Sequence, residues 1–444
     1  MHRNEKTSWT ARVQPPSITV VGPVRHPFVK VSATLLATVL FLVSVPVIAN
    51  WWSQPVQAFF GRQLVHDGTD FAAFYAAGKL VGSGQGSDIY DVQVVAPIEH
   101  KAAPQISKDA VVPYLNPPFF SLLFVPLAQL PFQDAYRVWS LINVGLLGCI
   151  CWMLWLTFRD HSIWWRFGTV AAMLTLYPTT TVLREGQFSL LLTTSWLLTY
   201  LLLRSGRNRT AAFAFGPMLI KPELALPVFL FLAWKRNSAF AVTFMGLATA
   251  LVLISVIVVG PAGAVNYPFY LLDIASRDGY GTNIGAFFGW NGLIAQPFGK
   301  EHAGLVTLAS VPPTFLTFAF VAFASRRELT YKETSMDYVW AMLTLAAVLA
   351  DSHFYIHDTV LVVAGTAGAL SAVAKQSGVQ AMAWASLAWI LLACGLMPQS
   401  RLGLNVFTPF LIAAFIAFGM RLRSESASRM PDSVPAEAKS YIAA

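Results

Sequence analysis

The chain has 444 residues, of which 56% are hydrophobic and 12% are charged. This balance excludes an ordinary soluble protein, because soluble domains carry about 25% charged residues. The formal net charge of +8 does not indicate nucleic-acid binding, since a membrane protein collects basic residues in its cytoplasmic loops. The three cysteines, Cys149, Cys151 and Cys394, all lie in apolar runs, so they indicate neither a disulfide framework nor a metal site.

The two ends of the chain are polar. Residues 1–30 are basic, which predicts a cytoplasmic tail. The apolar run at residues 31–49 lacks a small-residue cleavage pattern, so we expect a retained first membrane span and not a signal peptide. Residues 421–444 are poor in apolar side chains, which predicts a disordered cytoplasmic tail. We expect one transmembrane domain between the tails, at residues 31–420.

The bias of Lys and Arg between successive loops predicts an all-α polytopic membrane protein of about twelve helices, with both ends in the cytoplasm. The two largest loops on the opposite side are residues 50–136 and 261–301. Within the first loop, residues 115–131 contain four prolines. Proline breaks helices, so we expect a re-entrant or interfacial piece there. In residues 208–235 we expect two short helices that meet at Lys221-Pro222.

This topology gathers most of the polar residues of the apolar region on one face, opposite the cytoplasm. Ionisable side chains at membrane depth are costly and usually mark a pathway or a site. Residues far apart in the sequence converge there, as one functional site requires. They are Asp67, Asp70, Arg184, Glu185, Gln187, Lys221, Glu223, Asp351, His353, His357 and Asp358.

Four segments in a fixed order resemble glycosyltransferase family 87. They read "GTDFAAFYAAGKLV", "YLNPPFFSLLFVPLAQLPFQDAYRVW", "REGQFSLLL" and "KPELALPVFLFLAWKR". The resemblance implies a membrane enzyme of GT-C architecture with a helical first outer loop, like the polyprenyl-phosphate-mannose-dependent mannosyltransferases. It also implies an acidic residue near the acceptor in that loop, here Asp70 or Asp67, and a histidine in a later outer loop, here His353 or His357.

Asp70 is the candidate general base. An acceptor hydroxyl must lose its proton as it attacks the sugar C1, and a carboxylate within hydrogen-bond reach can take that proton. The alternative is structural, since Asp70 precedes a helix-like run and has the chemistry of an N-cap. Asp67 is either a helper of the base, a solvated loop residue or a partner of Arg184.

Arg184 and Lys221 are the candidate cations for a donor phosphate, because arginine binds phosphate bidentately and lysine acts as a point charge. Arg184 could instead pair with Glu185 or extend its charged end to the membrane interface, and Lys221 could lie exposed at the interface. Gln187 and Asn291 are candidate sugar contacts, or else helix caps or hydrogen bonds between helices.

His353 and His357 are four residues apart, a spacing that zinc accepts. A third convincing ligand and an HExxH glutamate are missing, so we expect no metal site and no cofactor. A histidine contact to the donor phosphate or sugar is the alternative that the pattern favours, and interfacial packing stays open.

We therefore expect a hexosyltransferase of the bacterial inner membrane, with its site facing the periplasm or the cell exterior. The expected partners are a polyprenyl-phosphate sugar donor, a glycolipid or glycan acceptor, and membrane lipid. A transporter or flippase of lipid-linked sugars is the alternative, although such proteins often show internal repeats and none is visible here. An inactive relative is a third reading, and it differs from the first only in lacking a base.

Overall fold

The computed structural model describes residues 45–61, 70–104, 106, 111–276, 287–298, 302–326, 333–394 and 405–428. The chain divides into two compact units, Met1–Asn50 and Trp51–Ala444. Of the first unit, residues 45–50 are described, and they are helical. The features below belong to the second unit.

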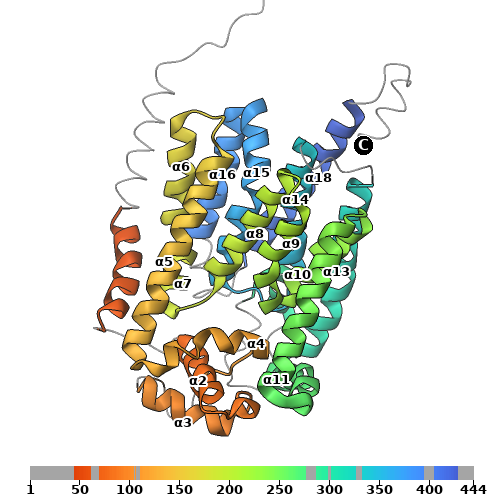
Figure 1. Ribbon diagram of the computed structural model, residues 1–444. Coiled ribbons are helices and arrows are strands. Elements are labelled where there is room, and N and C mark those ends of the chain that lie inside the picture. The colour runs from red at the N-terminus through yellow and green to blue at the C-terminus, as the bar shows by residue number, and fades with distance from the viewer. Residues whose placement is uncertain are drawn as a thin grey trace, which may run out of the picture. The chain divides into compact units, whose positions relative to one another are not determined.

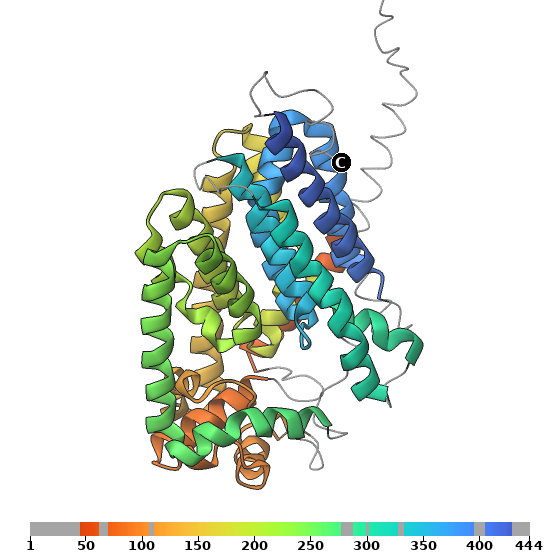
Figure 2. The ribbon, with the colours of Figure 1, turned by 90° about the vertical axis from the view of Figure 1, so that its right-hand side faces the viewer.

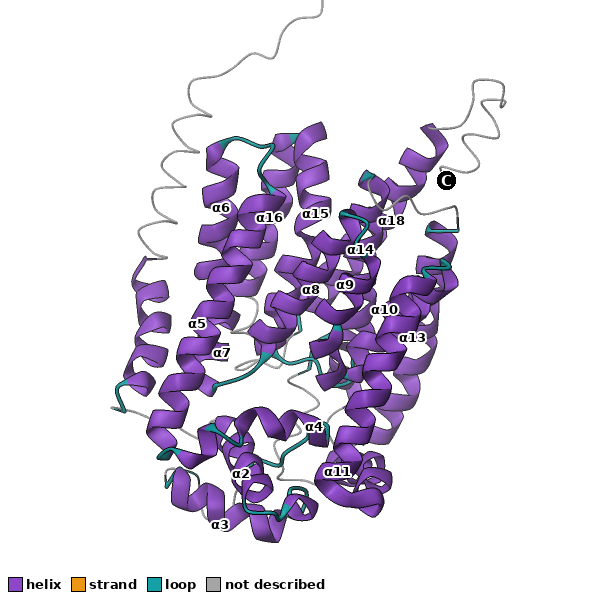
Figure 3. Cartoon of the chain, in the orientation of Figure 1, coloured by secondary structure: helices purple, strands orange, loops and turns teal. Residues whose placement is uncertain are grey.

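Within the described residues, the second unit is built from helices alone, as Figure 3 shows. After a helix over residues 51–59, its α-helices are α2 (Phe71–Gly82), α3 (Val92–Ala102), α4 (Pro118–Ser121), α5 (Phe132–Thr157), α6 (Ile163–Leu174), α7 (Tyr177–Glu185), α8 (Ser189–Arg204), α9 (Asn208–Ala214), α10 (Pro222–Trp234), α11 (Ser238–Ser276), α12 (Gly289–Phe298), α13 (Ala303–Ala324), α14 (Thr334–Ala350), α15 (Val360–Gln376), α16 (Gly378–Cys394) and α18 (Phe407–Ser428). Short 3-10 turns join them: η1 (Gly86–Asp88), η2 (Leu122–Phe124), η3 (Leu127–Gln129), η4 (Gly216–Ile220) and η7 (Ile356–Thr359).

Five helices among the described residues are long and apolar enough to cross a membrane. They are Phe132–Thr157, Ser238–Ile274, Gly304–Ala324, Ile356–Gln376 and Phe407–Glu425. Several other apolar helices, including α8, α10 and α14, are shorter than the roughly 20 residues that a span needs. The chain is thus an all-helical membrane protein, and the predicted count of twelve spans is not confirmed.

The segment predicted as the first outer loop forms a helical layer at one end of the bundle, called the outer-loop layer below. In Figure 1, α2, α3 and α4 lie together at the lower end of the bundle, and α4 lies beside the lower part of α11. The aromatic ring of Phe74 in α2 stacks on Phe124 of η2, 5.0 Å between centroids. At Gly78, an added Cβ would lie 2.7 Å from the backbone of Phe124. Only glycine therefore lets α2 pack this closely against η2.

Residues 115–131 form α4, η2 and η3, none of which is a membrane-length helix. Pro117 and Pro118 stand at the start of α4, where a missing amide proton costs nothing. Pro126 and Pro131 stand just outside η3 and α5. The prolines therefore break the segment into short pieces, as the sequence predicts.

Helix α11 changes direction at Gly260, which has a non-helical backbone (φ 76°, ψ 166°). The part before it is already long enough to span a bilayer, and the part after it turns aside, as the lower green helix in Figure 2 shows. Tyr267 in this second part donates a hydrogen bond to the Leu115 carbonyl at 2.9 Å. The ring of Tyr90 lies 4.8 Å from that of Tyr270. The beginning of the predicted loop 261–301 is therefore helical and packs on the segment predicted as the first outer loop.

Small residues bring the inner helices close together. Helix α14 is buried along almost its entire length and packs against α15 and α18. A Cβ added at Gly365 of α15 would lie 2.3 Å from the Thr344 side chain of α14. Close approach through small residues is the usual basis of helix packing in membranes.

Two further expectations can be compared with the described helices. Residues 208–235 form α9, η4 and α10, and the break at Lys221-Pro222 is confirmed because α10 begins at Pro222. Helix α18 continues past Arg421 to Ser428, into the segment where the sequence predicts a disordered tail. The tail 1–30 and residues 429–444 lie outside the described residues.

Candidate active site

Asp70 lies at the junction between the outer-loop layer and the helix bundle. It is the residue before α2, yet its side chain makes no capping hydrogen bond to the helix. Its carboxylate instead accepts a hydrogen bond from Nε2 of Gln187, at 2.5 Å, from the segment between α7 and α8. The capping role that the sequence left open is therefore not what holds this carboxylate.

The end of α7 presents the partner side chains. The helix ends at Gly186 in the left-handed conformation (φ 67°), where a side chain is disfavoured. The backbone N–H of Gln187 closes the last turn by donating to the Val182 carbonyl at 3.0 Å. Trp139 of α5 donates its indole N–H to the Gly186 carbonyl at 2.7 Å. This turn places Glu185 and Gln187 on either side of a rigid glycine.

Glu185 is held by two side chains from different directions. Its Oε1 lies 2.6 Å from the Arg184 guanidinium, and its Oε2 lies 3.6 Å from Nδ1 of His357 in η7. Arg184 also donates to Oε1 of Gln54 at 2.7 Å. The pairing of Arg184 with Glu185 is one of the alternatives that the sequence leaves open for this arginine.

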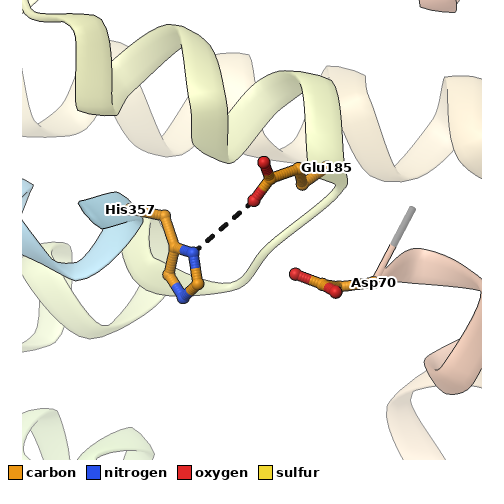
Figure 4. Close-up of side chains that lie close together, drawn as sticks. All are labelled: Asp70, Glu185 and His357. Atoms are coloured by element: carbon orange, nitrogen blue, oxygen red, sulfur yellow. Dashed lines mark ion pairs between the residues drawn. The ribbon is translucent and has the colours of Figure 1, made fainter. Parts of the chain in front are cut away.

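Figure 4 shows that Asp70, Glu185 and His357 point toward one another from three separate elements. One nitrogen or oxygen atom from each lies within 4.8 Å of the others. Two carboxylates and an imidazole could hold a divalent cation. However, the charge of Glu185 already faces Arg184, and Asp70 already accepts from Gln187. Each of these two carboxylates thus has a side-chain partner among the described residues.

The two carboxyl groups of this cluster differ in proton affinity. Burial, with the neighbouring charge of Glu185, raises the pKa of Asp70 from its ordinary value to about 6, against the opposing influence of His357, Gln187 and Arg184. Burial also acts on Glu185, but its contacts with His357 and Arg184 outweigh burial and lower its pKa. Near neutral pH, Glu185 is thus a fixed anion and Asp70 is a carboxylate that can exchange a proton.

Lys221 lies in a second buried group next to this cluster. Its ammonium pairs with Oδ2 of Asp358, whose Oδ1 accepts from Ser189 at 2.7 Å. Burial opposes the charge of Lys221, but Asp358 outweighs it and raises the pKa of the lysine. Oδ2 of Asp358 also lies 3.6 Å from Nε2 of His357, which joins the two groups.

Asp351 lies close enough to Lys221 to feel its charge, and one of the two Asp351 carboxylate oxygens has a hydrogen-bond partner in the described structure. Its Oδ1 accepts from the His353 amide at 2.8 Å, and its Oδ2 has no hydrogen-bond partner in the described part of the chain. Burial raises the pKa of Asp351 to about 7, although Lys221 opposes this.

The remaining predicted site residues lie elsewhere or outside the described residues. His353 contacts Ser352 and the Phe287 ring, and burial lowers its pKa to about 4, so it is neutral near pH 7. Asn291 is buried in α12, and no hydrogen bond within the described ranges joins it to Asp70. Asp67 falls outside the described residues. Of the two histidines, it is His357 that the fold brings to Asp70.

The sequence did not assign a role to three carboxyl groups that the fold brings into this region. Glu185 and Asp358 are among the polar residues that the predicted topology gathers on one face. Each directly follows a candidate site residue, Arg184 and His357 respectively, and that adjacency could have pointed to them. Glu99 of α3 gave no signal. It is fully buried, its Oε2 accepts from the Val112 amide at 3.0 Å, and its Oε1 has no partner among the residues described.

Comparison with known proteins identifies the family of the chain. The model of glycosyltransferase family 87 matches residues 114–352, which is more than half of the chain. The match includes Glu185, Gln187 and Lys221, whereas Asp70 and His357 lie outside it. No curated protein and no solved structure matches the chain. The match to the family model is sufficient: the chain belongs to glycosyltransferase family 87 and is a membrane glycosyltransferase.

Proposed function

We propose that the protein transfers a hexose, mannose in the first instance, from a polyprenyl-phosphate donor to an acceptor hydroxyl on the non-cytoplasmic side of the membrane, with Asp70 as the general base. The acceptor oxygen attacks C1 of the sugar, and the bond from C1 to the phosphate oxygen breaks. The phosphate leaves on its polyprenyl chain, and the hydroxyl proton passes to Asp70. No general acid is needed, because the leaving group is already a phosphate.

The observation that carries the role of Asp70 is that its carboxylate is not used as a helix cap. It accepts a hydrogen bond from Gln187, and burial, with the neighbouring charge of Glu185, raises its pKa to about 6. A base with a pKa near the working pH combines ionisation with a useful affinity for the incoming proton. Asp67, the proposed helper, precedes it in the chain.

The choice of donor rests on the resemblance to polyprenyl-phosphate-mannose-dependent enzymes and on the absence of a nucleotide-binding motif from the sequence. Arg184 is the proposed cation for the donor phosphate. Its guanidinium adjoins the Asp70 cluster and is partly exposed. Contacts of Lys221, His353, His357 and Asn291 with the donor stay predictions. A transporter is the weaker alternative, because the chain belongs to a family of transferases.

The proposed donor can be tested with the purified full-length protein in liposomes that contain a lipid extract of the native host as the acceptor source. Labelled mannose supplied on polyprenyl phosphate should appear in a new lipid or glycan product. Nucleotide-activated mannose, given under the same conditions, should yield none. Transfer from the nucleotide donor alone, or from neither donor, would contradict the proposal.

A further inference from the structure

The cluster around Asp70 contains a second carboxylate to which the mechanism above gives no role. Glu185 is partly exposed, and its two oxygens face Arg184 and His357. Its carboxylate lies within 4.8 Å of that of Asp70. Two like charges this close repel each other, and the repulsion is strong where water is partly excluded. A protein that keeps two carboxylates this close needs separate partners for each of them.

Those contacts are present on the described elements around the pair. Arg184, anchored by Gln54, holds Glu185 from one side, and His357 holds it from the other. Among the described residues, Gln187 donates the side-chain hydrogen bond that Asp70 accepts. Glu185 is thus fixed as an anion, while Asp70 has one neutral donor and a negative neighbour.

We propose that Glu185 is a positioning residue that acts through Asp70, keeping the proton affinity of the base high enough to accept the proton of the acceptor hydroxyl. This inference rests on the proposed role of Asp70 and extends it. Glu185 touches neither the sugar nor the acceptor. Its effect is electrostatic, because a fixed negative charge disfavours ionisation of a neighbouring carboxyl group.

The charged groups that face Asp70 act in different directions. Glu185 raises its pKa, whereas His357 and Arg184 lower it. Glu99 of α3 also feels the charge of Asp70, but burial raises the pKa of Glu99 to about 8, so it is neutral where Asp70 titrates. Removing the charge of Glu185 should therefore lower the pKa of Asp70, and removing the charge of Arg184 should raise it.

The test is the pH dependence of kcat/KM for sugar transfer, which reports the pKa of the essential base in the free enzyme. For the wild type, the rate should rise with pH through the pKa of Asp70, about 6. In Glu185→Gln this acid limb should move to lower pH by about one pH unit, a typical effect of a close charge. The plateau above the limb should fall several-fold, because the base is weaker.

Three further variants make the result specific. Glu185→Asp keeps the charge, so its acid limb should stay near that of the wild type. Glu99→Gln replaces a carboxyl group that is already neutral, and it should leave the limb in place. Arg184→Gln should move the limb to higher pH, because Arg184 lowers the pKa of Asp70. This shift in the opposite direction tests the inference even if Glu185→Gln fails to fold.

The outcomes separate this inference from the proposed function. An unmoved limb in both Glu185→Gln and Arg184→Gln, with only a lower rate or melting temperature, overturns the role of Glu185 and leaves Asp70 as the base. Loss of activity with a chelator, restored by Mn²⁺, would make the cluster a metal site and would overturn it as well. An active Asp70→Asn variant with an unchanged acid limb overturns the proposed function itself.

Discussion

Three carboxyl groups near the outer-loop layer have different proton affinities because their partners differ. Glu185 faces a guanidinium and an imidazole, and its pKa falls. Asp70 has an amide donor and a negative neighbour, and its pKa rises to about 6. Glu99 is fully buried and accepts from the Val112 backbone among the described residues, and its pKa rises to about 8. Partners in space, rather than residue type, decide which of them can serve as a base near neutral pH.

Glu99 should make stability depend on pH. Its carboxyl stays protonated in the folded state up to about pH 8, whereas in the unfolded chain it ionises near pH 4.5. Its contribution to stability is thus fully present below about pH 4.5 and is lost as the pH rises to about 8. Each pKa unit corresponds to about 1.4 kcal/mol, so the penalty is on the order of a few kcal/mol.

Glu99→Gln removes this penalty, because the amide cannot ionise and still accepts from Val112. The melting temperature of the variant in detergent should exceed that of the wild type at about pH 8, and the difference should vanish at about pH 5. Comparing the two proteins across pH isolates Glu99 from other titrating groups. A difference that does not change with pH would show that Glu99 is ionised in the folded state.

At the scale of elements, the site depends on how the end of α7 meets the start of α2. Gly186 separates Glu185 from Gln187, and a Cβ at Gly186 would lie 2.7 Å from the Cβ of Phe71, the residue after Asp70. The close approach lets Gln187 reach the Asp70 carboxylate. A glycine is required for two reasons, its positive φ and the absence of space.

Gly186→Ala should therefore lower transfer activity by more than about tenfold, since small displacements of positioning groups are costly in catalysis. Gly84→Ala is the matched control. Gly84 also has a positive φ (79°), but no atom lies within 4 Å of its added Cβ. Both variants should lose about 1 kcal/mol of stability from backbone strain, and Gly186→Ala should lose more because its added Cβ overlaps Phe71. Equal activity in the two variants would show that the contact with Phe71 does not position the site.

The sequence predicted those elements whose signals are local. Proline spacing predicted that residues 115–131 would be broken, and Lys221-Pro222 predicted the start of α10. It could not predict the partner of Asp70, because Gln187 lies 117 positions away and either a cap or a base fits the local pattern. The sequence could not decide between His353 and His357 for the same reason. Only the packing of η7 against α7 brings one of them to Glu185.

For the whole molecule, composition and motif order were enough for the class and the family. Low charge and long apolar runs predicted an all-helical membrane protein, and the family match confirms the resemblance. The number of spans was harder to predict. Charge alternation divides apolar runs into complete crossings, whereas α8, α10 and α14 are short and α11 turns aside at Gly260. The side of the membrane that the Asp70 cluster faces stays a prediction.

The turnover of Asp70→Asn tests the central claim most directly. Asparagine keeps the shape of the side chain, can still accept from Gln187 and occupies the N-cap position as well as aspartate does, but it cannot take a proton. With polyprenyl-phosphate-mannose as donor, we expect turnover to fall about 10²- to 10⁴-fold, the usual contribution of a general base, while the melting temperature and donor binding stay those of the wild type. Near-normal turnover of the purified variant would contradict the account, and the base would then be sought at Asp67.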